Sequence, residues 1–137
     1  MSYHKLIIIG NLGRDPEMRY SPSGDPVTSM NIASNRVYTD GSGQRQKETT
    51  WFRVSVWGKQ AESCNTYLKK GSMVLVEGEL KPDKDTGSPR VYTRADGSSG
   101  SSYEVTARTV RFLTPRGTGT DEALDDGGDL GEEDIPF

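Results

Sequence analysis

The chain has 137 residues and a formal net charge of −3, and its charges are unevenly distributed. Residues 1–120 contain all 17 Lys and Arg but only 12 Asp and Glu, a balance of +5, whereas the last 21 residues contain eight acids and no base. The length excludes two full domains. The net positive charge of residues 1–120 suits a polyanionic partner. The acidic end either keeps the chain soluble or binds a basic pocket of another protein.

Short apolar runs separated by Gly-rich turns predict a chain that is built mainly of strands. The first predicted strand covers residues 5–10 and ends in a bend. A dense turn cluster at 21–26 precedes the second predicted strand at 27–38. A Gly-rich loop then leads to the third predicted strand at 49–58, in which apolar and other side chains alternate.

Residues 59–70 predict a short helix after the third strand. Ala61, Cys64 and Leu68 recur at helical spacing between polar residues, and Gly71 follows as a C-terminal stop. Cys64 is expected to be a small side chain on the packed face of this helix and not a nucleophile.

The remaining ordered segments are two strands and the long hairpin between them. Residues 73–80 and 103–113 predict the fourth and last strands, and residues 81–102 predict a protruding hairpin with a flexible tip. Residues 97–102 are all Gly or Ser, so we expect them to be flexible and to add nothing to a core.

The order of three strands, a short helix and two further strands is typical of an all-β domain with a five-stranded OB-fold barrel. We assign this domain to residues 1–113. Residues 114–137 have too few apolar groups to bury, and we expect them to form a disordered acidic tail.

The third predicted strand holds the most informative side chains. Trp51, Arg53 and Trp57 project from the face opposite the core, where the indoles could stack unpaired bases and the guanidinium could bind phosphate. The alternative is that the two Trp side chains pack under a loop or in a subunit contact. The side chains predicted to face the core are Phe52, Val54 and Val56.

Two other segments mix bases and aromatics in the same way. Arg36 and Tyr38 lie at the end of the second predicted strand, and Arg90, Tyr92 and Arg94 lie in the predicted hairpin. Such a mixture is, by itself, more often a solvated surface than a site.

A single cysteine excludes an internal disulfide, no signal peptide precedes the first strand, and no apolar run approaches the ~20 residues of a membrane span. We therefore expect a cytoplasmic protein with no membrane association.

A metal-dependent nuclease is the alternative from another class of function, because nucleases also act on single strands. The acidic residues before the tail do not form a cluster that would bind a metal ion. Asp15 and Glu17 lie in a turn motif, and Glu77 and Glu79 are alternate residues on the exposed face of a predicted strand. His4 is the only histidine, and no Cys/His spacing indicates zinc. We therefore expect no enzyme activity, no metal and no cofactor.

Several motifs follow one another along the chain. They read GNLGRDPEMRY at 10–20, WFRV at 51–54, WGK at 57–59, YLKKG at 67–71, VEG at 76–78 and DIPF at 134–137. Over residues 4–113 and at the C-terminal tip, they resemble the bacterial single-stranded DNA-binding protein family. The resemblance implies an OB-fold homotetramer at the nucleoid that binds and protects single-stranded DNA without sequence preference during replication, recombination and repair.

The resemblance also implies roles for individual residues. Trp51 and Trp57 match stacking aromatics of the family, and Tyr38 falls where the family has a further aromatic. The family often has a Trp where this chain has Asp85, within a longer hairpin, and we expect Tyr92 to take that stacking role. Basic positions that resemble phosphate contacts of the family are Arg53, Lys59, Lys70, Lys5 and Arg19.

The C-terminal tip combines apolar side chains with a carboxylate. By the resemblance, Asp134, Ile135, Pro136 and Phe137 recruit replication and repair proteins through an apolar pocket with a basic rim. An OB-type RNA chaperone or primosome adaptor is the remaining alternative, because barrels of this kind do not distinguish RNA from DNA by fold.

Overall fold

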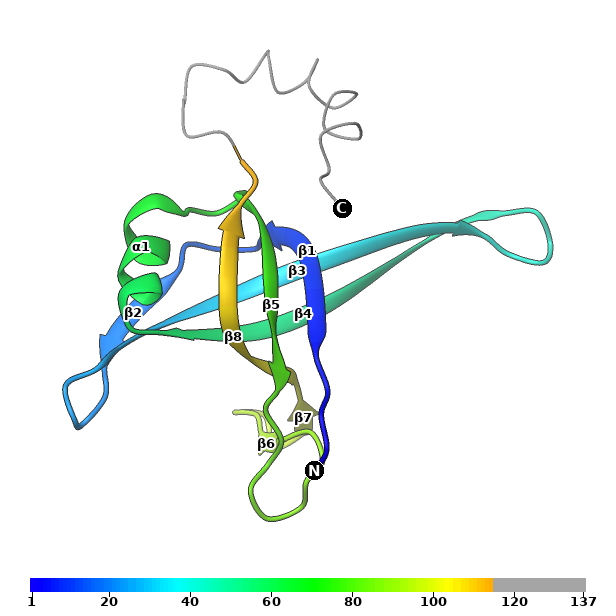
Figure 1. The fold of residues 1–137 in the computed structure, drawn as a ribbon. Helices are drawn as coiled ribbons and strands as arrows, with labels where there is room; N and C mark the ends of the chain where they lie inside the picture. Colours follow the sequence, from blue (N-terminus) through cyan, green and yellow to red (C-terminus); the bar gives the residue numbers. More distant parts are fainter. Residues whose placement is uncertain (115–137) are drawn as a thin grey trace.

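The computed structural model describes residues 1–114, and its centre is a closed barrel of five strands (Figure 1). Hydrogen bonds join them in the order β1 (Leu6–Leu12), β5 (Met73–Leu80), β8 (Tyr103–Phe112), β4 (Arg45–Trp57) and β3 (Pro26–Thr39), and β1 pairs again with β3 to close the ring. The OB-type all-β barrel predicted from the sequence is confirmed.

The barrel core consists of the inward-facing half of each strand. Ile8, Ile32, Val54, Val76 and Val105 are each no more than 3% exposed. These apolar side chains alternate with exposed ones because successive residues of a strand point to opposite faces of the sheet.

The helix α1 (Lys59–Tyr67) packs against β3 and β4. Ala61 and Cys64 are fully buried, and the hydroxyl of Thr28 in β3 donates a 2.6 Å hydrogen bond to the carbonyl of Ala61. Burial raises the pKa of the Cys64 thiol to about 11, which agrees with a packing role for this residue. The helix is shorter than predicted, because the backbone becomes extended at Leu68.

One short strand was not predicted. β2 (Glu17–Tyr20) pairs with β3 at the edge of the sheet, so Glu17 lies in a strand and not in the turn motif to which the sequence analysis assigned it. Four residues are too few to give a clear period-2 pattern.

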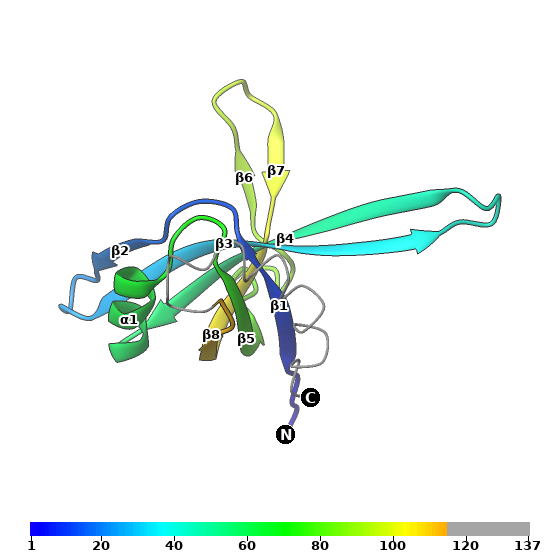
Figure 2. The same cartoon turned by 90° about the horizontal axis from the view of Figure 1, so that it is seen from above.

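Two arms project from the barrel in different directions, as Figure 2 shows. The longer arm is the outer part of the β3–β4 ribbon, which stays paired as far as Thr39 and Arg45. At its tip the Asp40 carboxylate accepts hydrogen bonds from the Ser42 hydroxyl and the Gln44 amide, which lower its pKa to about 2. The shorter arm is the hairpin of β6 (Val91–Thr93) and β7 (Ser99–Ser101).

The shorter arm corrects the interpretation of the Gly/Ser run at 97–102. Its composition predicts a flexible segment, but Ser99–Ser101 forms β7, and Gly100 is buried. A Cβ at Gly100 would lie 2.6 Å from an Arg94 guanidinium nitrogen and 2.9 Å from the Tyr92 ring. Glycine is therefore needed because two side chains of β6 and its turn lie across the backbone of β7.

Among residues 1–114, no helix is long and apolar enough to cross a membrane. The expected disordered tail lies outside the described residues, apart from Thr114.

Gly78 lies where the β5–β8 register shifts, and the two backbones approach closely there. A Cβ at Gly78 would be 2.1 Å from the Thr106 carbonyl oxygen, so we expect Gly78→Ala to lower the free energy of unfolding by about 1–3 kcal/mol. Urea denaturation measures this change. Gly41→Ala is the control, because nothing lies within 4 Å of that position; equal stability of the two variants would contradict the close approach.

Candidate nucleic-acid interface

The solvent-facing side of the β3–β4 ribbon combines aromatic and basic side chains. We call its β4 residues the outer strip: Arg45, Lys47, Trp51, Arg53 and Trp57. They share one face because they are alternate residues of β4, whereas Val54 and Val56 point into the core. Trp51 is 53% exposed and Trp57 is 44% exposed, as the alternation of the sequence predicts.

The two indoles are well separated along the outer strip. Trp51 and Trp57 are six residues apart in an extended strand, which corresponds to roughly 20 Å. Arg53 lies between them, and among residues 1–114 its guanidinium forms no ion pair. A flexible polyanion with planar groups could therefore contact both rings and the cation at once.

The Trp51 ring lies against the backbone of another strand end. A Cβ at Gly13, just after β1, would be 2.6 Å from Cζ3 and 2.7 Å from Cη2 of the indole. The Gly13 amide donates a 2.9 Å hydrogen bond to the carbonyl of Asn31, so the backbone on which the ring rests is itself fixed. No local pattern of the sequence indicates this contact, because it joins residues that are distant in the chain.

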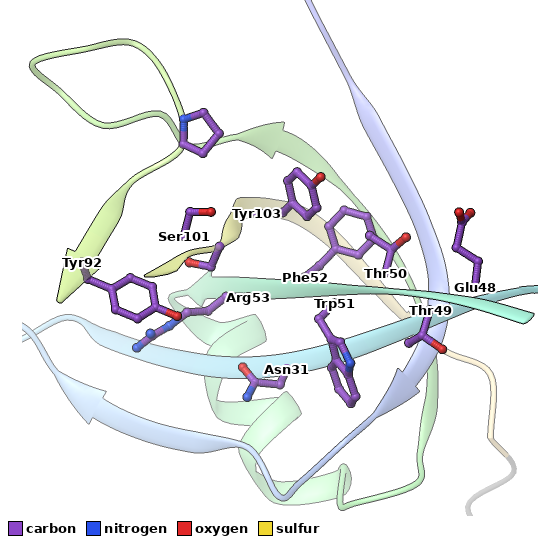
Figure 3. A pocket seen from close by; sticks show the side chains of 12 residues that line it. Asn31, Glu48, Thr49, Thr50, Trp51, Phe52, Arg53, Tyr92, Ser101 and Tyr103 are labelled. Carbon is purple, nitrogen blue, oxygen red and sulfur yellow. The ribbon is translucent and has the colours of Figure 1, made fainter. Parts of the chain in front are cut away.

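A groove opens beside the outer strip, between β4 and the shorter arm (Figure 3). We call it the arm groove; its volume is about 720 Å³. Trp51, Phe52 and Arg53 of β4 line one side, and Tyr92 of β6 and Tyr103 of β8 also line it. Trp51, Arg53 and Tyr92, three predicted site residues, are thus brought to one groove, together with Tyr103, which was not predicted.

Arg36 and Tyr38 lie on the opposite face of the ribbon from Trp51. Arg36 pairs with Glu48 and Tyr38 with Gln46, and these positions alternate with those of the outer strip. The Arg36 guanidinium lies 4.6 Å from the centre of the Tyr38 ring and 3.2 Å from a Glu48 carboxylate oxygen.

The predicted bases of the shorter arm already have partners. The Arg94 guanidinium lies 5.7 Å from the centre of the Tyr92 ring and donates a hydrogen bond to the carbonyl of Ser99. Arg90 lies 3.8 Å from a carboxylate oxygen of Glu104. Arg94 therefore joins the two strands of the arm, and the charge of Arg90 already has a carboxylate partner.

The four remaining predicted bases are spread over the molecule. Lys5 pairs with Glu77 at 3.3 Å on the β1–β5 side, and Lys70 follows α1. Arg19 is the β2 partner of Val27, which in turn pairs with Trp57, so Arg19 shares the outer face with that indole. Lys59 begins α1, two residues after Trp57.

The predictions from the sequence did not include three exposed residues, namely Arg45 and Lys47 of the outer strip and Tyr103 of the arm groove. The Gly-rich turn after Asp40 could have indicated Arg45 and Lys47, because this turn sets the register that puts them on the same face as Trp51. Tyr103 has the parity of the buried Val105, yet it is 54% exposed because it lies where the barrel ends. No sequence signal indicates that position.

Within residues 1–114, no group of three or more His, Cys, Asp or Glu side chains could hold a metal ion.

The barrel and its exposed aromatic and basic strip define the chain as an OB-type binding domain. Residues 3–113 match the model of the single-strand binding protein family. The single-stranded DNA-binding protein of Thermotoga maritima is 38% identical over 136 residues, which cover 97% of this chain and 89% of that protein. The chain belongs to the single-strand binding protein family.

Other relatives are longer. The single-stranded DNA-binding protein of Neisseria meningitidis is 37% identical over 116 residues, which cover 85% of this chain but 63% of that protein. The chain thus spans less than two thirds of the length of this relative.

Two solved structures have similar folds. A deletion mutant of the single-stranded DNA binding protein from Thermus aquaticus matches 82% of this chain and 51% of its own, with a TM-score of 0.61 and 31% identity. A Plasmodium falciparum single-strand binding protein in complex with single-stranded DNA matches 83% of this chain and 97% of its own, with a TM-score of 0.68 and 23% identity. The second likeness is one of fold alone.

We expect Gly13→Ala to displace the Trp51 ring, because the added methyl group would occupy the space of the indole edge. The variant is made together with Trp57→Phe, which leaves Trp51 as the only tryptophan of the chain. The measurements are the Trp51 emission maximum and its quenching by acrylamide. Gly41→Ala in the same background is the control; identical spectra for the two variants would exclude the contact.

Proposed function

We propose that the chain binds single-stranded DNA without sequence preference. The observation that carries this proposal is the solvent-facing position of Trp51 and Trp57 on either side of Arg53, which has no ion-pair partner among residues 1–114. Indole faces stack on any base, and a cation between them neutralises the backbone, so neither contact reads sequence. The relatives, which are named as single-stranded DNA-binding proteins, support the same ligand.

We propose that binding, without catalysis, is the whole activity of the domain at residues 1–113. A protein that coats single strands protects them while replication, recombination and repair proceed. We assign this role to the cytoplasm, where the chain would associate with the nucleoid.

We also propose that the chain is a homotetramer. Support comes from the outer face of β1 and β5, where Ile7 is 58% exposed and Met73 is 39% exposed. Ile9 and Leu75, which pair with each other across the two strands, lie between them on the same face. Contact between copies of the chain would remove this apolar surface from water.

The tail at 114–137 is proposed to recruit partner enzymes through Asp134, Ile135, Pro136 and Phe137. Its sequence supports this role, because apolar side chains beside acids suit an apolar pocket with a basic rim, whereas solubility alone requires no terminal apolar group.

Replacement of either tryptophan tests the binding surface. We expect Trp51→Ala and Trp57→Ala each to weaken binding of single-stranded DNA by about 1–3 kcal/mol, because each removes one stacking platform. Both fall outside the core, so the melting temperature should change little. Affinities are measured by titration with fluorescent DNA, with equal-length RNA as competitor. Unchanged affinity in both variants would refute the proposal, and tighter binding of RNA would favour the RNA chaperone.

Deletion of residues 130–137 tests the tail. We expect the truncated chain to lose partner enzymes in pull-downs from a bacterial lysate while its DNA affinity stays equal or rises, because fewer acids compete with DNA for the basic body. Adding one residue after Phe137 should have the same effect on the partners, since it displaces the carboxylate. If the intact, extended and truncated chains capture the same proteins, the tail only keeps the chain soluble.

A further inference from the structure

The longer arm extends beyond the support of the barrel (Figure 2). Over residues 34–39 of β3 and 45–50 of β4, each strand pairs only with the other among the described residues, because β1, β2 and β8 pair closer to the barrel. Each of residues 34–50 is exposed or half-buried, so the arm has no core of its own. An isolated two-stranded ribbon is marginally stable at best in water, so polar contacts must fix the arm.

The register of the arm decides where its free cations lie. Arg45 and Lys47 lie on the face of Trp51, because they are alternate residues of β4. Neither cation forms an ion pair within residues 1–114. A bulge of one residue between the barrel and the tip would turn both cations to the other face of the ribbon.

Asp40 fixes the tip of the arm through its carboxylate. Its Oδ1 accepts hydrogen bonds from the amide and the hydroxyl of Ser42, at 2.9 and 2.7 Å, and from the amide of Gln44 at 2.9 Å. Its Oδ2 accepts a 3.0 Å hydrogen bond from Nε2 of Gln46, which lies on β4 between the two cations. We call these hydrogen bonds the tip network. The network joins the turn to the start of β4 and therefore opposes a bulge there.

The inner and outer halves of the arm are held by different side chains. Nearer the barrel, Arg36 lies 3.2 Å from a Glu48 carboxylate oxygen, and the Thr49 hydroxyl donates a 2.7 Å hydrogen bond to Oδ1 of Asn35. Outward of these two pairs, every side-chain hydrogen bond that the arm forms within residues 1–114 involves Asp40. The alignment of the two cations therefore depends on this one carboxylate.

The tip network is present at neutral pH. The hydrogen bonds from Ser42, Gln44 and Gln46 lower the pKa of Asp40 from 3.8 to about 2. Because the pKa of the folded state is depressed, the stabilisation is complete above about pH 4 and is lost only as the pH falls toward 2. The carboxylate is therefore ionised at neutral pH, and it adds a negative charge to the arm that carries the two cations.

By its charge alone, such an acid weakens the binding of a polyanion. We infer that Asp40 is nevertheless a positioning residue for DNA binding, because its tip network holds Arg45 and Lys47 on the Trp51 face. The inference rests on the proposed function and deepens it. A carboxylate raises the affinity for single-stranded DNA by aligning two cations.

Two substitutions that remove the same charge test this role. Asp40→Ala deletes the tip network. Asp40→Asn keeps it, because the amide oxygen accepts from Ser42 and Gln44, and the amide nitrogen donates to Oε1 of Gln46 after the terminal amide of Gln46 turns over. If charge alone mattered, both variants would bind oligo(dT) equally and somewhat more tightly than the unsubstituted chain.

We expect the two variants to differ in opposite directions. Asp40→Ala should bind oligo(dT) up to about 25-fold more weakly at about 0.1 M salt, which is the counterion-release contribution of two phosphate contacts. Asp40→Asn should bind as tightly as the unsubstituted chain or more tightly, because it keeps the alignment and loses an acid. Affinities are measured by titration of the full chain with fluorescent oligo(dT).

Salt dependence separates the alignment of the cations from a general loss of structure. Loss of two phosphate contacts makes the log–log slope of affinity against salt shallower by roughly 1.4, whereas damage elsewhere would lower the affinity without this change. Hydrogen exchange of the arm amides, followed by mass spectrometry, should be faster in Asp40→Ala than in Asp40→Asn. Equal melting temperatures of the two variants verify that the barrel is intact.

Asp25→Ala is the matched control for charge. Asp25 lies in the turn between β2 and β3, where its carboxylate accepts a 3.2 Å hydrogen bond from the Ser23 hydroxyl. This variant removes an acid without changing the longer arm. We expect its affinity and its salt slope to equal those of Asp40→Asn.

The failures of the two proposals are distinguishable. The inference is overturned if Asp40→Ala binds as tightly as Asp40→Asn, or if it binds more weakly with an unchanged salt slope. If Trp51→Ala and Trp57→Ala still weaken binding in that case, the proposed function stands without the inference. If neither tryptophan variant weakens binding, the proposed function itself fails, whatever the Asp40 variants do.

Discussion

The pairing of β4 with β3 along the full length of β4 is the constraint on which the surface depends. The unbroken antiparallel register from Val27 and Trp57 to Thr39 and Arg45 fixes which side chains face inward. A slip of one residue would bury Trp51 and expose Val54, so the hydrophobic core and the exposed aromatic strip are two results of one register. The burial of Val54 and Val56 therefore fixes the face from which Trp51 and Trp57 project.

Ion pairing decides which cations of the body remain available. Arg36, Arg90 and Lys5 each lie within 4 Å of a carboxylate, whereas Arg53 has no such partner among residues 1–114. Exposed ion pairs of this kind contribute little to stability, so their main effect here is to localise the free positive charge. A count of basic residues therefore overstates the binding surface, because paired bases attract an anion less strongly.

Glycine allows the close approaches that build the site. Gly78 lets β5 and β8 meet at the bulge, Gly13 leaves room for the Trp51 ring, and Gly100 leaves room for Arg94 in the shorter arm. In each case a Cβ on the glycine would collide with atoms of another segment of the chain. These glycines are thus required by contacts and not by turns.

The sequence alone determined the strands of the barrel, the helix after the third predicted strand and the two faces of that strand, because period-2 alternation and glycine stops are local properties of the chain. Only the tertiary structure decided that Tyr92 and Tyr103 line one groove with Arg53, and that Arg36 and Tyr38 lie on the other face of the ribbon. It also made a strand of Ser99–Ser101, against its composition. These features depend on register, on barrel closure and on contacts between distant segments, which no local pattern encodes.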